Sequence, residues 1–179
     1  MYYSTAYSSP LGKITLACHD DNLVGLWTEE QKYHGGTIPE PMIKNNDIPV
    51  FGAAIDWLDR YFSGDRPGIA ELPLAPVGGE FRQLVWKILR EIPYGKVITY
   101  GDIARKVALK TGRASMSSQA VGGAVGHNPI SIIIPCHRVV GSNGSLTGFA
   151  GGIHMKLKLL ELEGVDMSGL FIPKKGTAL

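Results

Sequence analysis

Apolar and polar residues alternate along the first thirty residues of the chain. The segments 2–8, 13–19 and 22–29 show this period of two, and Ser, Pro, Gly, Asp and Asn stand between them. A period of two is typical of half-buried strands, so the pattern predicts three short strands joined by tight turns. Residues 31–48 are rich in Gly, Pro and Asn and predict a loop.

A helical period begins near Pro49 and stops at Gly64, and its apolar face holds Phe51, Ile55, Leu58 and Phe62. The segment 64–79 carries three Pro and four Gly and is the best candidate for a linker. A second apolar stripe predicts a helix from about residue 80 to Ile92, closed by Pro93. We therefore predict an α/β (α+β) protein, with a small N-terminal sheet-plus-helix domain and its linker at residues 1–79. A mostly helical C-terminal domain follows at residues 80–179.

Two short helices predicted inside the second domain suggest a helix-turn-helix. The first is capped by Thr99, and the second has Ala120, Val121, Ala124 and Val125 on its apolar side. The second helix also contains Gly122, Gly123 and Gly126, and each interior Gly costs about 1 kcal/mol relative to Ala. Close approach of a DNA strand would explain this cost, and so would close helix packing; the sequence leaves both open.

Charge is distributed unevenly between the two predicted domains. Residues 1–81 carry a net charge of −6 and residues 82–179 a net charge of +8, which gives +2 for the chain. A basic second half favours a polyanionic partner, although an ordinary solvated surface is the alternative. We find no membrane span and no signal peptide. With two cysteines in all, we expect reduced thiols in the cytoplasm.

Cys136 stands between Pro135 and His137 in the stretch "IIIPCHRVVG". The apolar run 130–134 predicts a buried strand or strand-like segment, which Pro135 ends, so Cys136 has rigid support behind it. Such a position suits a nucleophile, and His137 and Arg138 would favour the thiolate. Neighbouring residues on a strand point to opposite faces, however, so a direct contact from His137 needs a turn or a bridging water. A buried structural cysteine is the alternative.

Glu163 lies in the last turn of a predicted helix, three and four residues after Leu160 and Leu159 on its apolar stripe. A carboxylate there opposes the helix dipole, and an unpaired buried charge is costly. We expect a partner, and His137 is the best candidate, which would give a Cys–His–Glu relay. The alternative is that Glu163 points into solvent. His19 and His34 lack the spacing of a zinc site, and we predict no metal and no cofactor.

The segment 80–164 resembles the methylated-DNA–protein-cysteine methyltransferases, also called O6-alkylguanine-DNA alkyltransferases. The resemblance rests on "PCHRVV" with "GSNGSLTGFAGG", on "IPYGKVITYGDIA" and on "AVGGAVGHNP", all in order, and more weakly on "SSPLGKITLA". It implies a DNA-repair protein that binds duplex DNA by a winged helix-turn-helix and flips O6-alkylguanine out of the helix. The alkyl group then passes irreversibly to Cys136, once per molecule.

The resemblance also assigns residues. It implies catalysis by Cys136, His137 and Glu163, with His137 acting through a water, and support from Asn128 and Tyr100. Tyr100 would rotate a backbone phosphate and donate its hydroxyl to the leaving guanine. The implied DNA contacts are Tyr100, Gln119, Ala120, Gly122, Gly123 and Arg138. The implied base pocket consists of Val139, Phe149 and Ala150.

Two positions depart from the family pattern. Gln119 stands where relatives often carry the arginine that fills the gap left by the flipped base, so we expect weaker support for base flipping or lower DNA affinity, with the reaction intact. Phe149 replaces a frequent tyrosine and loses its hydroxyl. A lesion sensor without catalysis and, less favoured, a cysteine hydrolase are the alternative functions; the presence of Cys136 argues against the first. We expect a monomer, and the sequence leaves open whether O4-alkylthymine is also repaired.

Overall fold

The computed structural model describes residues 1–174, which fall into two compact units. The N-terminal unit comprises Met1–Gly78 together with Pro129–Ile133, and the C-terminal unit comprises Gly79–Asn128 and the chain from Ile134 onward. The boundary predicted from the sequence falls between residues 79 and 80, at the end of the Gly-rich linker, and the units divide between Gly78 and Gly79. The segment Pro129–Ile133, which the sequence assigns to the second domain, groups instead with the first unit.

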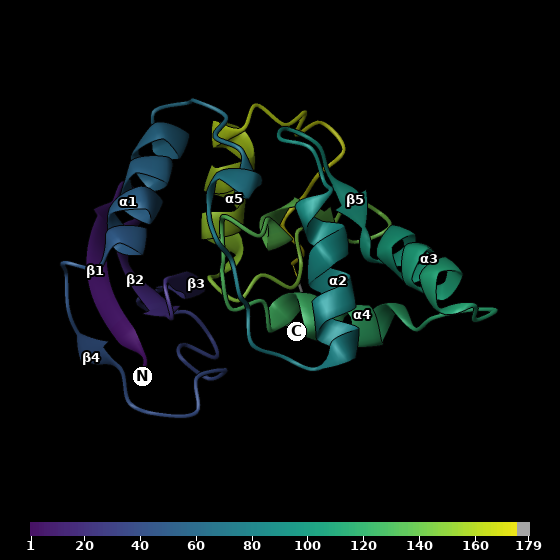
Figure 1. Ribbon diagram of the computed structural model, residues 1–179. Helices are drawn as coiled ribbons and strands as arrows, with labels where there is room; N and C mark the ends of the chain where they lie inside the picture. The colour runs from purple at the N-terminus through teal and green to yellow at the C-terminus, as the bar shows by residue number, and fades with distance from the viewer. Residues whose placement is uncertain (175–179) are drawn as a thin grey trace. The chain divides into compact units, whose positions relative to one another are not determined.

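A four-stranded sheet forms the centre of the N-terminal unit, with the order β3-β2-β1-β4 (Figure 1). The strands are β1 (Tyr3–Ser9), β2 (Gly12–His19), β3 (Asn22–Thr28) and β4 (Ile43–Lys44). The first three are antiparallel and correspond to the predicted strands, whereas β4 pairs in parallel with β1 and was missed. Two residues inside a Pro- and Asn-rich loop carry no strand period, so β4 had no signal in the sequence.

The hairpin between β2 and β3 turns on two acidic residues. Asp20 and Asp21 both have positive φ, of 46° and 61°, which is the conformation of a two-residue type I′ turn. Asp tolerates this region because its short side chain can bond locally. The turn therefore fixes the register in which Cys18 pairs with Leu23 near the sheet end.

One helix packs on this sheet, α1 (Pro49–Phe62), with Pro49 in its first turn as predicted (Figure 1). Its buried residues are Val50, Phe51, Ala54, Trp57, Leu58 and Tyr61. The predicted stripe was close to this face, but Ile55 and Phe62 lie at its half-buried edge. The predicted linker holds a short 3-10 helix, η1 (Ile69–Glu71), and Trp57 Nε1 donates a hydrogen bond to Gly68 O at 2.9 Å.

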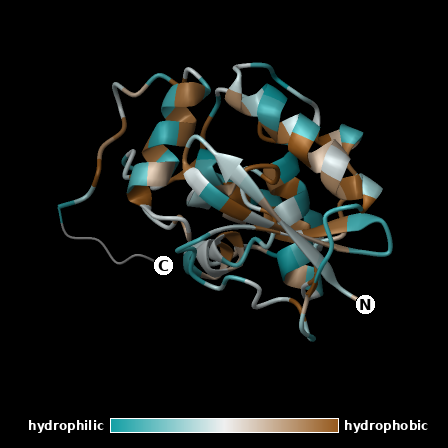
Figure 2. Cartoon of the chain, turned by 90° about the vertical axis from the view of Figure 1, so that its left-hand side faces the viewer, coloured by the Kyte–Doolittle hydropathy of each residue, from teal (hydrophilic) through white to brown (hydrophobic). Residues whose placement is uncertain are grey.

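The C-terminal unit is mostly helical. Its helices are α2 (Glu80–Arg90), α3 (Tyr100–Thr111), α4 (Ser118–Gly126) and α5 (Ile153–Leu162), with a short 3-10 helix η2 (Cys136–Arg138). A parallel pair of two-residue strands, β5 (Ile98–Thr99) and β6 (Val139–Val140), completes it. Hydrophilic and hydrophobic residues alternate along the helices, as expected for amphipathic helices that bury one face (Figure 2). The mixed α/β class predicted from the sequence is confirmed.

The helix α3 has well-formed ends. Thr99 Oγ1 accepts a hydrogen bond from Asp102 N at 3.0 Å, while the Asp102 carboxylate accepts from Thr99 N at 2.9 Å. This reciprocal pair is a capping box, with Asp in place of the usual Glu. Gly112 ends the helix in the left-handed region, at φ 64°. The predicted start at Thr99 is therefore confirmed.

The apolar run before Cys136 is not a strand, and this prediction was wrong. Ile130 forms an isolated bridge with Leu26, and residues 131–134 are turns. Ile132 has a φ of +71°, which no strand contains. The run is fully buried as predicted, but a short apolar stretch has the same pattern in a buried strand and in a buried turn.

Candidate active site

Cys136 is the first residue of η2 and is 5% exposed. Both thiols of the chain, Cys18 and Cys136, are reduced and buried. The sequence left open whether Cys136 and His137 point to opposite faces. Because η2 is helical, the backbone turns at these two residues. A 3-10 turn rotates successive side chains by about a third of a circle rather than a half, so Cys136 and His137 do not point to opposite faces.

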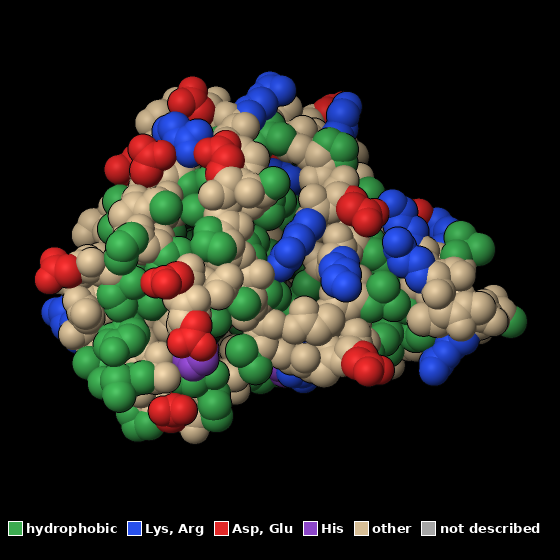
Figure 3. Space-filling view, in the orientation of Figure 1, with side chains coloured by type: hydrophobic (Ala, Val, Ile, Leu, Met, Phe, Trp, Pro, Cys, Tyr) green, Lys and Arg blue, Asp and Glu red, His purple; other side chains and the backbone are tan. Residues whose placement is uncertain are grey.

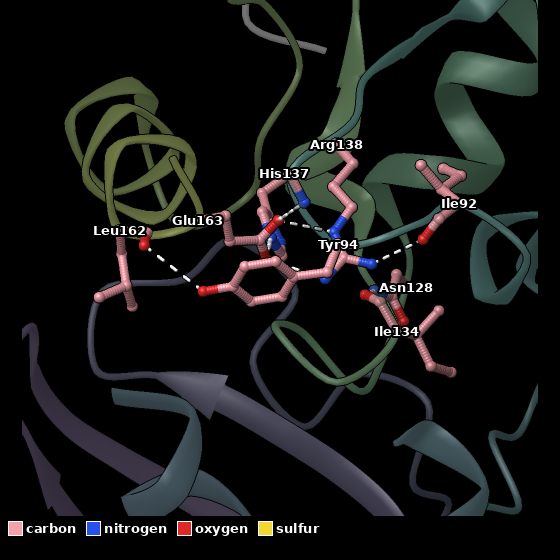
Figure 4. A network of polar contacts seen from close by, with 9 residues as sticks. Ile92, Tyr94, Asn128, Ile134, His137, Arg138, Leu162 and Glu163 are labelled. Carbon is pink, nitrogen blue, oxygen red and sulfur yellow. Dashed lines mark hydrogen bonds and ion pairs between the residues drawn. The ribbon is translucent and has the colours of Figure 1, made fainter. Parts of the chain in front are cut away.

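Glu163 lies at the centre of a buried ionic cluster (Figure 4). Its Oε1 accepts hydrogen bonds from His137 Nε2 at 2.7 Å and from Arg138 Nη2 at 2.9 Å, and its Oε2 accepts from Arg138 Nε at 2.9 Å. The amide of Gly95 adds a bond to Oε2 at 3.2 Å. The predicted pairing of Glu163 with His137 is thus present, and the alternative of a solvated Glu163 is wrong.

Arg138 is the residue that lets Glu163 stay ionised. Its guanidinium holds the carboxylate with two bonds, donates from Nη1 to Ile92 O at 2.7 Å, and lies 5.6 Å from the centre of the Tyr94 ring. A bidentate pair in which each guanidinium nitrogen also makes a hydrogen bond is an arrangement that compensates a buried charge well. The guanidinium is thus turned inward to Glu163, and the DNA contact of Arg138 stays a prediction.

The protonation states of the cluster follow from these bonds. Burial alone would raise the pKa of Glu163, but the hydrogen bonds and charges of His137 and Arg138 outweigh it and bring the pKa well below its usual value. Burial lowers the pKa of His137, and the attraction of Glu163 opposes this only in part. His137 is therefore neutral near pH 7, beside an ionised carboxylate.

The tautomer of His137 can be inferred from its partners. An ionised carboxylate only accepts hydrogen bonds, so the imidazole proton must lie on Nε2, which faces Glu163. This leaves a lone pair on Nδ1, an atom that is buried and has no hydrogen-bond partner within residues 1–174. A buried, unprotonated imidazole nitrogen one residue from a thiol is suited to accept a proton.

Lys156 is a charged residue of this site that the sequence analysis missed. It is fully buried on α5, where its Nζ donates to Val139 O and, at 2.7 Å, to Thr147 O. Burial lowers its pKa to about 8, opposed by the charge of Cys136. Lys156 lies three and four residues before Leu159 and Leu160, so the helical period did place it on the buried stripe.

The carbonyl of Thr147 also accepts a hydrogen bond from the Tyr100 hydroxyl, at 2.8 Å. Burial, with the charge of Cys136, raises the pKa of Tyr100, so its hydroxyl keeps its proton and acts as a donor. Tyr100 and Lys156 together fix the start of the segment that contains Phe149 and Ala150.

The remaining predicted support and pocket residues lie around this cluster. Asn128 is buried, and its Nδ2 donates to Ile134 O at 2.7 Å, so it closes the loop that leads to Cys136. The Val139 amide bonds to Cys136 O, and its carbonyl accepts from Lys156. Phe149 is nearly buried, against Gly151, where an added Cβ would lie 2.7 Å from the ring.

The residues predicted to contact DNA on α4 divide into two groups. Gln119 and Ala120 are exposed, although Ala120 was also placed on the apolar side, and Gly123 is half-buried. A Cβ built on Gly123 or Gly126 would meet nothing within 4 Å, so helix packing does not require glycine there. Gly122 is buried on the inner side of the helix, and its DNA contact stays a prediction.

The described part of the chain, residues 1–174, holds no group of three His, Cys, Asp or Glu side chains that could bind a metal ion. Within the same residues no helix has the length and apolar content needed to cross a membrane.

Two family models together match nearly the whole described chain. Residues 1–76 match the ribonuclease-like domain of 6-O-methylguanine DNA methyltransferase, and residues 80–165 match its DNA-binding domain. The methylated-DNA–protein-cysteine methyltransferase of Haemophilus influenzae is 40% identical over 162 residues, covering 90% of this chain and 86% of that protein. The enzyme of the same name from Methanosarcina acetivorans is 41% identical over 166 residues, covering 92% and 99%.

Solved structures agree with these matches. The crystal structure of Mycobacterium tuberculosis O6-methylguanine methyltransferase has a TM-score of 0.77 and 40% identity, covering 91% of this chain and 93% of that one. A crystal structure of the M. tuberculosis OGT in complex with DNA has a TM-score of 0.75 and 41% identity, covering 90% and 91%. The fold and these matches define an alkyl-acceptor protein. The chain belongs to the family of 6-O-methylguanine DNA methyltransferases.

Proposed function

We propose that the protein repairs O6-alkylguanine in duplex DNA by transferring the alkyl group irreversibly to Cys136. The observation that carries this proposal is the neutral His137, the residue after Cys136, with Nε2 bonded to ionised Glu163 and Nδ1 left as an acceptor. Family membership supports the same reaction.

In the proposed reaction, Cys136 loses its thiol proton to His137 Nδ1 through a water molecule. Ionised Glu163 stabilises the imidazolium that forms, and the buried Lys156 ammonium favours the thiolate because Cys136 is among the charges that act on it. Sulfur then attacks the alkyl carbon, the carbon–O6 bond breaks, and a thioether forms. The guanine gains a proton from the Tyr100 hydroxyl, and Tyr100 regains one as His137 gives up the proton it took from the thiol, so the thiol proton is in net terms transferred to guanine.

The basic character of the C-terminal unit supports DNA as partner. Lys and Arg side chains gather over α2 and α3, whereas Asp and Glu are frequent over α1 (Figure 3). We propose that α3 and α4 act as a winged helix-turn-helix, with Gln119, Ala120 and Gly123 on the DNA side, and that Val139, Phe149 and Ala150 line the base pocket. Action as a monomer in the cytoplasm stays a prediction.

Repeated presentation of substrate tests the proposal. Excess duplex with one O6-methylguanine is mixed with the protein, and repaired DNA is counted. The proposal predicts repair that stops at one lesion per protein molecule. Continued turnover would favour a cysteine hydrolase, and tight lesion binding without repair would favour a lesion sensor; either result contradicts the proposal.

A further inference from the structure

The five residues before Ile134 are held by the edge of strand β3. Leu26 N donates to Pro129 O at 2.8 Å and Ser131 N donates to Leu26 O at 3.1 Å, so β3 gains a short parallel neighbour. The segment Pro129–Ile133 accordingly groups with the N-terminal unit, although it stands only three residues before Cys136. The chain that leads to the nucleophile is thus bonded to β3 three residues before it reaches the C-terminal unit.

Two three-residue turns connect this segment to Cys136. The amide of Ile133 donates to Ser131 O at 2.8 Å across Ile132, whose φ is +71°. A γ-turn with positive φ is rare and strained, most of all for a β-branched residue. The amide of Cys136 then donates to Ile134 O at 2.8 Å across Pro135, at φ −82° and ψ 65°, which is the favourable inverse γ-turn.

A strained turn persists only where surrounding contacts hold it. Gln31, just after β3, supplies such a contact. It is buried, and its Oε1 accepts hydrogen bonds from Thr28 N at 3.2 Å and from Ser131 Oγ at 3.1 Å. Ser131 is itself buried and directly precedes the strained residue. A single side-chain oxygen therefore joins the end of β3 to the turn.

We propose that Gln31 is a positioning residue for the nucleophile: through Ser131 it holds the strained turn at Ile132, and this turn fixes the backbone that presents Cys136. The inference rests on the proposed alkyl transfer, in which Gln31 touches neither DNA nor the reacting atoms. It acts only along the chain, through the two consecutive turns.

The test compares Gln31→Met, which keeps the size of the side chain and removes the acceptor, with the wild type. Gln31→Met loses the bonds from both Thr28 N and Ser131 Oγ, of which only the second reaches the turn, and loss of one hydrogen bond of ordinary strength corresponds to about a tenfold change in an equilibrium or rate. We expect methyl transfer at saturating DNA to slow by about that factor, with an unchanged dissociation constant for DNA. Amide hydrogen exchange at Ile133 and Cys136 should accelerate. Ser131→Ala removes the same bond from the other side and should behave alike.

Two further variants separate positioning from general stability. Gln31→Glu keeps both acceptor bonds and should restore the rate. Thr5→Val removes the partly buried bond from Thr5 Oγ1 to Asn46 Oδ1, 2.8 Å, elsewhere in the same unit, and should leave the rate unchanged. Melting midpoints of all variants are measured in parallel.

The decisive comparison uses Ile132→Gly, because glycine adopts positive φ without strain. In that background Gln31→Met should change the rate less than about twofold, since the turn no longer needs to be held. A wild-type rate for Gln31→Met, or an equal slowing in both backgrounds, would overturn the inference. If the wild-type protein transfers no methyl group, the proposed function is contradicted. Amide hydrogen exchange at Ile133 and Cys136 then decides by itself whether Gln31 holds the turn.

Discussion

Glu163 determines the protonation of the residues around it. Its ionised form is favoured by the bidentate Arg138 and by His137, and as an acceptor it holds the imidazole proton of His137 on Nε2, while burial keeps the imidazole neutral. Removing one member of a buried, hydrogen-bonded ion pair typically costs about 3–5 kcal/mol, because the other charge is left uncompensated. Glu163 therefore links the stability of the fold to the readiness of the nucleophile.

Acid unfolding should reveal this link. The pKa of Glu163 is lower in the folded protein than its ordinary value of 4.5, so the folded state binds fewer protons than the unfolded chain as the pH falls through that value. The stabilisation is complete above about pH 4.5 and is lost below it. Urea unfolding between pH 6 and pH 3 should show a steep loss for the wild type. Glu163→Gln should be less stable at pH 6 and show a shallower loss; parallel curves would contradict the assignment.

Single residues also show where sequence reasoning stopped. The position of Glu163 on an apolar stripe indicated burial and a cationic partner, and His137 was found. The same stripe contains Lys156, but a lysine is assumed to be exposed, so its burial was missed. Arg138 was assigned to DNA from the family resemblance, and only the tertiary structure shows that Glu163 neutralises its charge.

At the scale of elements, the stability of the helices α3 and α4 depends on the hydrogen bonds that cap their N-termini. The capping box of α3 satisfies backbone donors that no other residue in the helix can reach.

Loss of this cap should weaken the protein measurably. Thr99→Ala removes the acceptor for Asp102 N, and we expect a loss of about 1 kcal/mol in the free energy of unfolding. Denaturant titration measures it. Thr99→Ser, which keeps the hydroxyl, is the matched control and should lose much less. Equal losses for both variants would show that the methyl group rather than the cap matters.

On α4, the exposed Gln119 offers a test of DNA binding. Gln119→Arg adds one positive charge to the proposed DNA face, so affinity for duplex DNA should rise and its dependence on salt should steepen by about one counterion. Binding curves at several salt concentrations measure both. Gln119→Met serves as a control without charge. An arginine variant with the same salt slope as the wild type would argue against DNA contact at this position.

Most helices and strands could be predicted from the hydrophobic pattern, because amphipathic helices repeat every 3.6 residues and half-buried strands every two. The turn at 131–134 could not, since complete burial removes the polar positions that would reveal a period. Positive φ at Ile132 is also invisible in sequence, because isoleucine favours extended backbone. The strand predicted directly before the nucleophile was therefore wrong.

At the scale of the whole molecule, alkylation should affect stability. Cys136 is 5% exposed and is surrounded by tightly bonded backbone, so an added group must be accommodated in a nearly closed space. Adding methylenes to a packed site typically costs about 1–3 kcal/mol. We expect the melting midpoint to fall after reaction with O6-methylguanine DNA, and to fall further after a larger alkyl group. An unchanged or higher midpoint would contradict this prediction.

The two-unit division itself was only partly visible in the sequence. The linker at 64–79 and the opposite charges of the two halves indicated a boundary. The return of Pro129–Ile133 to the first unit depends on hydrogen bonds between residues about a hundred positions apart, such as that between Gln31 and Ser131. No local pattern encodes such a pairing.

The central claim is that Cys136 is the alkyl acceptor. Its most direct test is the intact mass of the protein after reaction with a duplex carrying one O6-methylguanine, followed by peptide mapping, with Cys136→Ala as control. We predict the gain of one methyl group, located on Cys136 and absent from the variant, while Cys18 stays unmodified. A methyl group on any other residue, or repaired DNA with no gain in mass, would contradict the account.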